Sequence, residues 1–343
     1  MTVVFLYGAR WLGIKIGLVD NPGGRKKHQA PVPLVGGFAI FLSLTITLGV
    51  LEPINTCFIF WVMCCALVLI SGVDDKVALR ASHRFILHFL IVCTGSLFGG
   101  SYITQVGDLV GSGVLVLGMG SVVFTGVSVV GVINAVNMMD GIDGLTACVT
   151  LVEVGLLFIL SLFGHYQVET MVIGAFIGAL LAFLVFNFPS QLFEKYRVFL
   201  GDTGSMLIGL MLAWLCIRLT QTGEYRYPPA LMLWILALPL MDTLYLMVDR
   251  KLRGVSLFRP DRHHIHHLFL RLNFTPRQTV SILSLISLSI GLVGIALYRL
   301  KVPELYLFLG ALIVFGSYSM GVYTLKRRLL IHNSLIQDSI GSF

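Results

Sequence analysis

The sequence predicts an all-α fold, a polytopic bundle of about ten or eleven membrane-spanning helices. Hydrophobic residues make up 57% of the 343 residues, and charged residues make up only 12%. Soluble domains carry about 25% charged residues, so this composition, with a mean hydropathy of +0.90, excludes a water-soluble enzyme. The 11% aromatic content and the long apolar runs exclude a disordered chain. Residues 1–343 are therefore expected to form a single integral membrane domain.

Ten continuous apolar stretches are long enough to serve as membrane spans, because about 20 helical residues cross the roughly 30 Å hydrocarbon core. None shows the alternation of a membrane β-barrel strand. The stretches are 34–51, 56–73, 85–104, 109–133, 145–163, 168–188, 204–220, 230–248, 279–298 and 305–325. An eleventh, 3–19, carries Arg10 and Lys15, and we interpret it as a short or truncated first helix without the features of a signal peptide.

Lysine and arginine are distributed unequally between the two sets of loops that alternate along the chain. One set holds 18 of these residues, and the other, made of short turns, holds 3. By the positive-inside rule the first set is cytoplasmic, and its charge suits anionic lipids or an anionic soluble substrate. No basic stripe with interleaved aromatic residues points to nucleic acid. The cytoplasmic set comprises 20–33, 74–84, 134–144, 189–203, 249–278 and the tail 326–343.

Acidic, amide and histidine side chains gather on this predicted cytoplasmic face. Carboxylates so close to hydrocarbon are costly, and they are usually paired or functional. The simpler interpretations are a helix end anchored among headgroups, a glycine-rich turn, or a cap on the following helix. The residues are Asp74 and Asp75; Asn134, Asn137, Asp140 and Asp143 in NAVNMMDGIDGL; Asp202 in FLGDTGS; and His263, His264, His266 and His267 in RPDRHHIHH.

The DGIDG and GDTGS motifs each precede an apolar stretch that starts at the cytoplasmic face. Two helix N-termini would then offer free N–H groups to phosphate at one site. Mg²⁺ typically takes one or two carboxylates together with waters and substrate phosphate oxygens. Asp143 and Asp202 fit that role if the fold brings them together. The pattern favours a magnesium-dependent diphosphate site.

The loop 249–278 combines four histidines with several arginines, and its interpretation is open between three alternatives. Four histidines within five positions could bind Zn²⁺, with Asp261 as the nearby acidic ligand. The surrounding cations, among them Arg259 and Arg262, oppose a metal and favour recognition of a diphosphate. The third alternative is a solvated loop. Asp242, inside the stretch 230–248, is assigned no role.

At these residues the sequence resembles the polyprenyl-phosphate N-acetylhexosamine-1-phosphate transferase family. The resemblance is strongest to the branch typified by undecaprenyl-phosphate N-acetylglucosamine-1-phosphate transferase, whose loop reads PDR-x-HIHH. The phospho-N-acetylmuramoyl-pentapeptide transferase branch has a different loop and is the alternative within the family. The matching motifs are GLVDNPGGRKKHQAPVPLVGG (17–37), VDDKVALRASHR (73–84), INAVNMMDGIDGL (133–145), YRVFLGDTGSMLIG (196–209) and SLFRPDRHHIHHLFLRLNFTPRQ (256–278).

This resemblance implies a reaction, a cofactor and a set of site residues. The family places its active site inward in the bacterial inner membrane and depends on Mg²⁺ or Mn²⁺. It transfers an N-acetylhexosamine 1-phosphate from a UDP-N-acetylhexosamine to undecaprenyl phosphate, with release of UMP, at the start of O-antigen or related envelope glycan synthesis. By matching motif, Asp143 and Asp202 resemble the metal ligands, Asp74, Asp75 and Asp140 the catalytic acids, and Asn137, Arg262, His264, His266 and His267 the substrate-binding residues.

Two activities outside this family compete with the resemblance. A transporter also places acidic residues in a helical bundle, but its sites lie near the bilayer midplane, whereas these acids lie at loop level. A phosphatase acting on polyprenyl diphosphate would release inorganic phosphate in place of UMP. The sequence leaves open the identity of the sugar, the downstream glycan and the formation of a homodimer.

Overall fold

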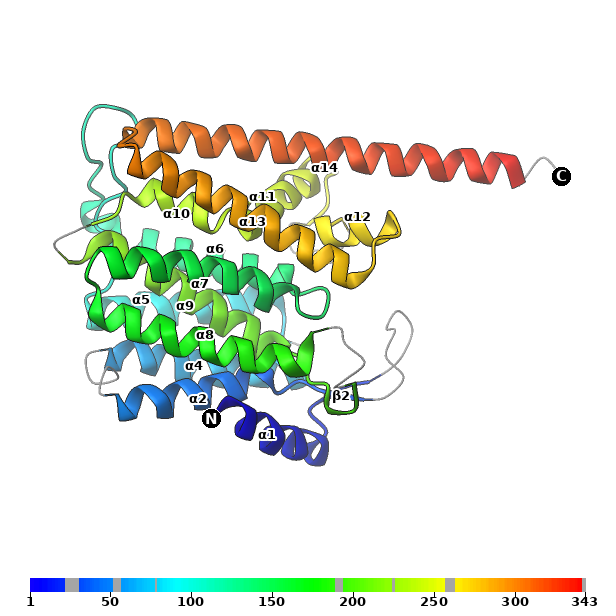
Figure 1. Cartoon of the computed structure of the whole chain (residues 1–343), viewed down its shortest axis with the longest axis horizontal. Helices are drawn as coiled ribbons and strands as arrows, with labels where there is room; N and C mark the ends of the chain where they lie inside the picture. Colours follow the sequence, from blue (N-terminus) through cyan, green and yellow to red (C-terminus); the bar gives the residue numbers. More distant parts are fainter. Residues whose placement is uncertain are drawn as a thin grey trace.

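Long helices packed side by side carry almost the whole chain in the computed structural model (Figure 1). The structure describes residues 1–21, 31–51, 57–77, 79–188, 194–223, 226–256 and 263–340. The helices are α1 (Thr2–Ile16), α2 (Gly36–Val50), α4 (Phe58–Val77), α5 (Ala81–Gly99), α6 (Ser121–Met139), α7 (Leu145–Phe163), α8 (Gln167–Asn187), α9 (Gly201–Gln221), α10 (Pro229–Ile235), α11 (Ala237–Leu252), α12 (Ile265–Arg271), α13 (Pro276–Arg299) and α14 (Glu304–Ile340). Single 3-10 turns lie at η1 (Gly118–Gly120) and η2 (Glu194–Tyr196), and β1 (Val19–Asp20) pairs antiparallel with β2 (Val32–Pro33).

The predicted all-α polytopic bundle is confirmed. Eight of the described helices are long and apolar enough to cross a membrane, and the number rises to nine if α10 and α11 form one bent span. α2 is also apolar but has only 15 residues. The predicted stretches 145–163, 168–188, 204–220 and 279–298 agree closely with α7, α8, α9 and α13. These four are continuous apolar runs with polar residues at both ends, which makes their boundaries readable.

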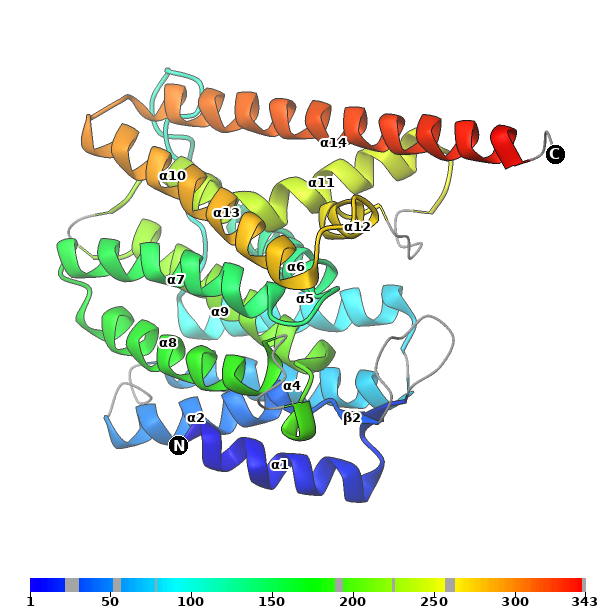
Figure 2. The same cartoon turned by 45° about the vertical axis from the view of Figure 1, so that its right-hand side comes forward.

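The predicted span 230–248 is broken in the structure, because the chain bends by 84° between α10 and α11. Pro239 lies in the first turn of α11. Proline has no N–H, so Pro239 cannot donate a hydrogen bond to the carbonyl of Ile235, and a helix breaks where that bond is lost. The break directs α11 toward the end of the bundle where α12 lies (Figure 2).

The predicted span 109–133 is displaced along the chain, because its first part is not helical and the apolar helical stretch runs over Gly118–Met139. Residues 101–117 form an irregular segment, and three of its glycines have φ values of 82°, 74° and 104°. Such values are readily adopted only by glycine, so this apolar run cannot continue as a helix. These glycines are Gly107, Gly111 and Gly113. α6 therefore starts after η1, and Asn134 and Asn137 lie inside its last turns and not in a loop.

α9 lies at the centre of the bundle. In its most apolar 18-residue stretch 94% of the residues are buried, against 17% for α14. Glycines allow neighbouring helices to approach it closely. A Cβ atom on Gly209 would lie 2.6 Å from the Cα of Ile133 in α6, and one on Gly37 in α2 would lie 2.5 Å from the Cα of Gly204. Backbone-to-backbone packing thus fixes the first turn of α9 against α2 and its middle against α6.

The loops lie at two opposite ends of the bundle (Figure 1). One end holds β2, the turn between α6 and α7, the start of α9 and α12. The other end holds the 101–120 segment and the turn between α13 and α14. We call the first the acidic end, because the predicted acidic and histidine residues within the described ranges lie there.

Candidate active site

Asp75, at the end of α4, caps the N-terminus of α9. Its Oδ1 accepts a hydrogen bond from the backbone N–H of Asp202 at 2.8 Å, and its Oδ2 accepts from the N–H and hydroxyl of Thr203 at 3.2 and 2.7 Å. Gly201 has a φ of 72°, and a Cβ there would come within 3.0 Å of Asp75 Oδ2. Two unpaired N–H groups of α9 are therefore satisfied by a carboxylate from another helix.

The side chain of Asp202 is consequently free to make other contacts. Its Oδ2 accepts a hydrogen bond from Arg84 Nη1 at 2.9 Å, and its Oδ1 accepts one from Asn137 Nδ2 at 3.0 Å. The same Arg84 nitrogen donates to Asp74 Oδ2 at 2.8 Å. The Asp74 side chain is 3% exposed and the Asp202 side chain is 41% exposed. Asp74 thus anchors Arg84, and Asp202 presents its carboxylate to the surface of the acidic end.

Asp140 and Asp143 lie in the turn that links α6 to α7. Asp143 forms an ion pair with Arg197 at 2.6 Å, with 24% of each side chain exposed. Burial and then the negative charges of Asp202, Asp143 and Asp75 raise the pKa of Asp140 to about 7. The carboxylates of this turn and of the α9 start are therefore electrostatically coupled, with more negative than positive charge around Asp140.

Asn187 holds this turn in place against the segment that leads into α9. Its Oδ1 accepts the N–H of Gly144 at 2.7 Å, and its Nδ2 donates to the carbonyl of Val198 at 2.9 Å. Gly144 has a φ of 77° and directly precedes α7. One buried amide thus connects the DGIDG motif to the segment before GDTGS.

The histidine segment is anchored by Asp242 of α11. His264 Nδ1 lies 2.7 Å from Asp242 Oδ2, and Asp242 Oδ1 accepts hydrogen bonds from the N–H of Ile265 at 3.0 Å and the hydroxyl of Tyr318 at 2.9 Å. Asp242, which sequence reasoning left without a role, is 2% exposed. It therefore fixes both the ring of His264 and the start of α12.

His266 joins the histidine segment to the DGIDG turn. Its ring is 1% exposed, lies 5.4 Å from the ring of His264 and 4.2 Å from that of His267, and occupies the space where a Cβ on Gly141 would lie. The structure places His266 as a buried packing group, with His264 and His267 beside it. Arg262 lies outside the described residues.

The structure thus places the predicted residues in two neighbouring groups. Direct hydrogen bonds or ion pairs join Asp74, Asp75, Asn137 and Asp202, through Arg84 and the start of α9. The DGIDG turn and the histidine segment lie beside them and are joined by His266. Sequence reasoning missed Arg84, Arg197 and Asn187, although Arg84 stands ten residues after Asp74 within the VDDKVALRASHR motif.

Comparison with known proteins identifies the family. The sequence profile of glycosyl transferase family 4 matches residues 57–220. The undecaprenyl-phosphate alpha-N-acetylglucosaminyl 1-phosphate transferase of Escherichia coli (strain K12) is 36% identical over 334 residues, covering 95% of this chain and 88% of that protein. The protein of the same name from Pasteurella multocida is 34% identical over 337 residues, covering 94% and 90%. The chain belongs to glycosyl transferase family 4.

In this family 4 glycosyl transferase the matched range runs from the start of α4 to the end of α9. It contains Asp74, Asp75, Asp140, Asp143 and Asp202, and it leaves out Asp242 and the histidine segment. Among the residues that the structure describes, no three histidine, cysteine or acidic side chains come close enough to enclose a metal ion. A divalent ion here would need oxygen atoms from its substrate to complete its coordination.

Acidification is expected to loosen the histidine segment of this family 4 protein. Burial and then the neighbouring His267 lower the pKa of His266 to about 3. Because the folded-state pKa lies below the ordinary value of about 6.5, stability is lost as pH falls below about 6.5, by up to about 1.4 kcal/mol per pH unit, until pH 3 is reached. Hydrogen–deuterium exchange in α12, corrected for the intrinsic rate, should therefore rise between pH 7 and pH 5. A His266→Leu variant should lose this pH dependence, and equal pH dependence in both proteins would contradict the assignment.

Proposed function

We propose that this protein transfers N-acetylglucosamine 1-phosphate from UDP-N-acetylglucosamine to undecaprenyl phosphate. An oxygen of undecaprenyl phosphate attacks the β-phosphorus, the bond from that phosphorus to the bridging oxygen breaks, and UMP leaves. The products are undecaprenyl-diphospho-N-acetylglucosamine and UMP, at the first membrane step of O-antigen or related envelope glycan synthesis. The observation that carries the proposal is the exposed Asp202 carboxylate, held by Arg84 and Asn137 at the capped start of α9, in a chain 34–36% identical to transferases of that name.

In this proposal Asp74 and Asp75 position other groups: Asp74 holds Arg84, and Asp75 holds the start of α9. Both oxygens of each carboxylate already accept hydrogen bonds, from Arg84 and Leu79 for Asp74 and from the start of α9 for Asp75. A phosphate monoester has a second pKa of about 6, so the attacking group is largely dianionic at neutral pH and needs no general base. Phosphoryl transfer of this kind is catalysed mainly by positioning and charge stabilisation.

The proposed cofactor is Mg²⁺, with Mn²⁺ as the alternative. The residues fit a hard cation, because Asp202 and Asp143 supply carboxylate oxygens on partly exposed side chains, and Mg²⁺ uses one or two carboxylates beside waters and phosphate oxygens. When bound, the ion supplies charge neutralisation at the diphosphate. Asp202 and Asp143 would hold it, and their present partners Arg84 and Arg197 compete with the ion for these carboxylates.

Chelation should therefore abolish turnover, and added Mg²⁺ should restore it. An ion pair as exposed as Arg197–Asp143 contributes about 0.2–1 kcal/mol. An Arg197→Gln variant removes this competition for Asp143, so it should need up to about fivefold less Mg²⁺ for half-maximal turnover. The measurement is UMP release against Mg²⁺ concentration. Turnover that survives chelation, or an unchanged Mg²⁺ requirement in the variant, would contradict these ligands.

The histidine segment, with Arg262, is proposed to engage the diphosphate of the sugar nucleotide. His264 and His267 are its candidate contacts, and His266 packs behind them. Replacing Asp242 with asparagine should lower turnover by about 10- to 100-fold, since it frees the His264 ring. A Tyr318→Phe variant removes one hydrogen bond to Asp242 but leaves its contact with His264, and it should cost far less. Equal losses would show that Asp242 serves the packing of α14 and not the position of His264.

The acidic end is proposed to face the cytoplasm of the bacterial inner membrane, where UDP-sugars are made. A cysteine-free background with one new cysteine tests this. Ser82→Cys, exposed beside Arg84, should react with a membrane-impermeant maleimide only after the membrane is opened. Ser112→Cys, exposed in the 101–120 segment, should react in spheroplasts with intact membranes. The reverse pattern would overturn the orientation.

The proposed activity is tested with the purified full-length protein in phospholipid vesicles. Radiolabelled UDP-N-acetylglucosamine, undecaprenyl phosphate and Mg²⁺ should yield labelled lipid and UMP. UDP-N-acetylmuramoyl-pentapeptide should yield neither. Use of the pentapeptide substrate alone would place the chain in the other branch, and release of inorganic phosphate from polyprenyl diphosphate would favour a phosphatase.

A further inference from the structure

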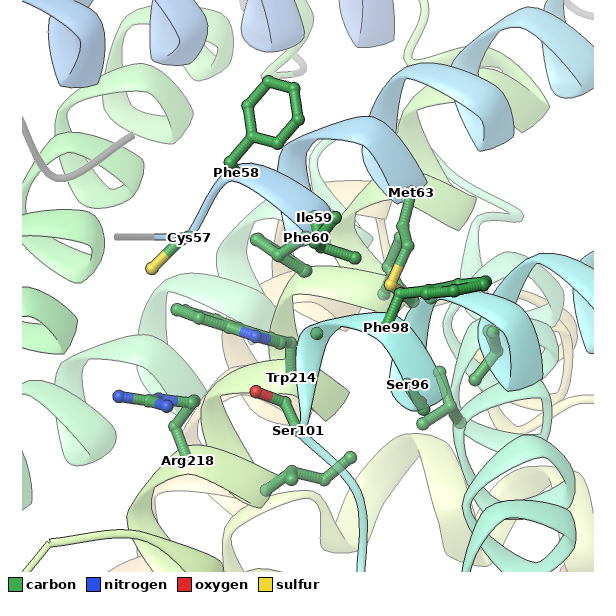
Figure 3. A pocket seen from close by; sticks show the side chains of 16 residues that line it. Cys57, Phe58, Ile59, Phe60, Met63, Ser96, Phe98, Ser101, Trp214 and Arg218 are labelled. Atoms are coloured by element: carbon green, nitrogen blue, oxygen red, sulfur yellow. The ribbon is translucent and has the colours of Figure 1, made fainter. Parts of the chain in front are cut away.

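A cavity of about 200 Å³ lies at the end of the bundle opposite the acidic end (Figure 3). It is enclosed by the start of α4, the end of α5, the middle of α6 and the last turns of α9. Arg218, which lines it, stands 16 residues after Asp202 on α9. At 1.5 Å per residue this separation is about 24 Å, so the cavity is not part of the proposed active site.

The polar part of the cavity is built around Arg218. Its Nε donates to Glu169 Oε1 of α8 at 2.6 Å, with 26% of the arginine and 4% of the glutamate side chain exposed. Its guanidinium lies 5.8 Å from the centre of the Trp214 ring. The structure gives its two terminal nitrogens no acceptor within the described ranges. Four N–H donors are therefore available to a ligand beside Ser101, which lies near Arg218 in Figure 3.

The rest of the cavity is lined mainly by aromatic and aliphatic side chains, and it opens toward the lipid. The Trp214 ring stacks on Phe60 with the ring centres 4.2 Å apart and 15° between the planes. Met63 and Phe98 lie together on the far side of Trp214 from Arg218 (Figure 3). Phe58 is 61% exposed and Phe98 is 77% exposed. Because both belong to helices long and apolar enough to cross the membrane, their exposed rings face lipid, and a ligand enters from the bilayer.

We propose that this cavity binds a phospholipid of the leaflet remote from the acidic end. The lipid phosphodiester accepts hydrogen bonds from the terminal nitrogens of Arg218. The first part of one acyl chain lies between Trp214, Met63 and Phe98. The ligand is thus a membrane lipid bound at a specific site, in contrast to the exchanging lipids of the surrounding bilayer.

The position of the ion pair in the membrane favours a lipid headgroup. Arg218 stands three residues before the end of α9, and Glu169 is the third residue of α8. Both therefore lie within about 5 Å of the helix ends, which is the depth of phosphate groups and not of the hydrocarbon centre. Glu169 offsets the charge of Arg218, so the electrostatic attraction of this site for free phosphate is small. The contacts of the acyl chain therefore select a phospholipid over free phosphate.

Native mass spectrometry of the full-length protein, released from detergent after purification from membranes, tests the proposal. The wild type should retain one phospholipid. An Arg218→Gln/Glu169→Gln double variant, which removes both charges together, should retain at least tenfold less. Glu169→Gln alone frees Arg218 from its partner and should retain at least as much as the wild type. A purely structural ion pair predicts instead that the single variant is the less stable protein and that lipid retention is the same in all three.

A second pair of variants tests the acyl-chain part without changing charge. Ser96→Leu adds bulk inside the cavity, where Ser96 is 3% exposed, and Thr94→Leu adds the same side chain on the exposed face of α5. The first should lose the retained lipid, and the second should keep it. Equal retention would overturn the proposal. Displacement of the phospholipid by inorganic phosphate alone, or by undecaprenyl phosphate, would overturn it as well and identify that ligand.

Discussion

Replacing Asp202 with asparagine is expected to lower UMP release by about 10²- to 10³-fold. The Asp202 side chain is 41% exposed, against 24% for Asp143 and 3% for Asp74, so it is the carboxylate most open to substrate among these three. The amide keeps the size of the side chain and removes its charge. Arg84 keeps its bond to Asp74, so the packing of α4 and α5 should survive. The measurement is UMP release in vesicles, with saturating undecaprenyl phosphate and Mg²⁺.

Asp108→Asn is the matched control for this change. Asp108 lies in the segment at the opposite end of the bundle, where its Oδ1 accepts a hydrogen bond from the N–H of Gly113 at 3.1 Å. The control makes the same chemical change far from the acidic end and should leave UMP release unaltered. A folded Asp202→Asn protein that turns over at the wild-type rate would remove Asp202 from the proposed site.

Replacing Gly37 with alanine is expected to destabilise the protein by about 1–3 kcal/mol and to abolish most of its activity. A Cβ at Gly37 would lie 2.5 Å from the Cα of Gly204 and 2.8 Å from the carbonyl carbon of Thr203. These are backbone atoms in the first turn of α9, so they cannot move aside as a flexible side chain would. α2 must shift away, and the start of α9, which carries Asp202, shifts with it. The unfolding midpoint in a denaturing detergent series measures the change.

Gly49→Ala provides the control on the same helix. No atom lies within 4 Å of the position that its Cβ would take. Alanine is the better helix former by about 0.8–1.0 kcal/mol, so this change should leave the protein as stable as before or slightly more stable. If both glycine variants unfold at the same midpoint, close packing at Gly37 is not what holds α2 against α9.

The helices were predictable from sequence where hydrophobicity alone decides the structure. α7 starts and ends at the predicted residues, because its apolar run is bounded by glycine-containing turns. The prediction missed the late start of the helix in 109–133, where glycines with positive φ turn an apolar run into an irregular segment, and the bend in 230–248, where Pro239 lies. Hydropathy measures the affinity of a stretch for the membrane, and it does not report the backbone conformation within that stretch.

The residues of the candidate site could be predicted from the sequence, but the hydrogen bonds and ion pairs between them could not. The acidic residues lie at the same end because the helices alternate in direction, a property that loop positions reveal. The partners of Asp202 could not be read in this way, since Arg84 and Asn137 reach it from helices distant in sequence. Asp242 carried a usable signal, because a carboxylate within an apolar stretch is usually paired or functional. Its partner His264 becomes evident only once α11 bends toward α12.

The fate of the β-phosphate distinguishes transfer of a sugar phosphate from transfer of the sugar alone. UDP-N-acetylglucosamine radiolabelled in its β-phosphate would be incubated with the protein, undecaprenyl phosphate and Mg²⁺, and the lipid and nucleotide products would be separated. We expect the label to pass to the lipid while unlabelled UMP is released, and we expect Asp202→Asn to prevent both. Label recovered in UDP, with sugar but no label on the lipid, would show glycosyl transfer and would overturn the proposed sugar-phosphate transfer.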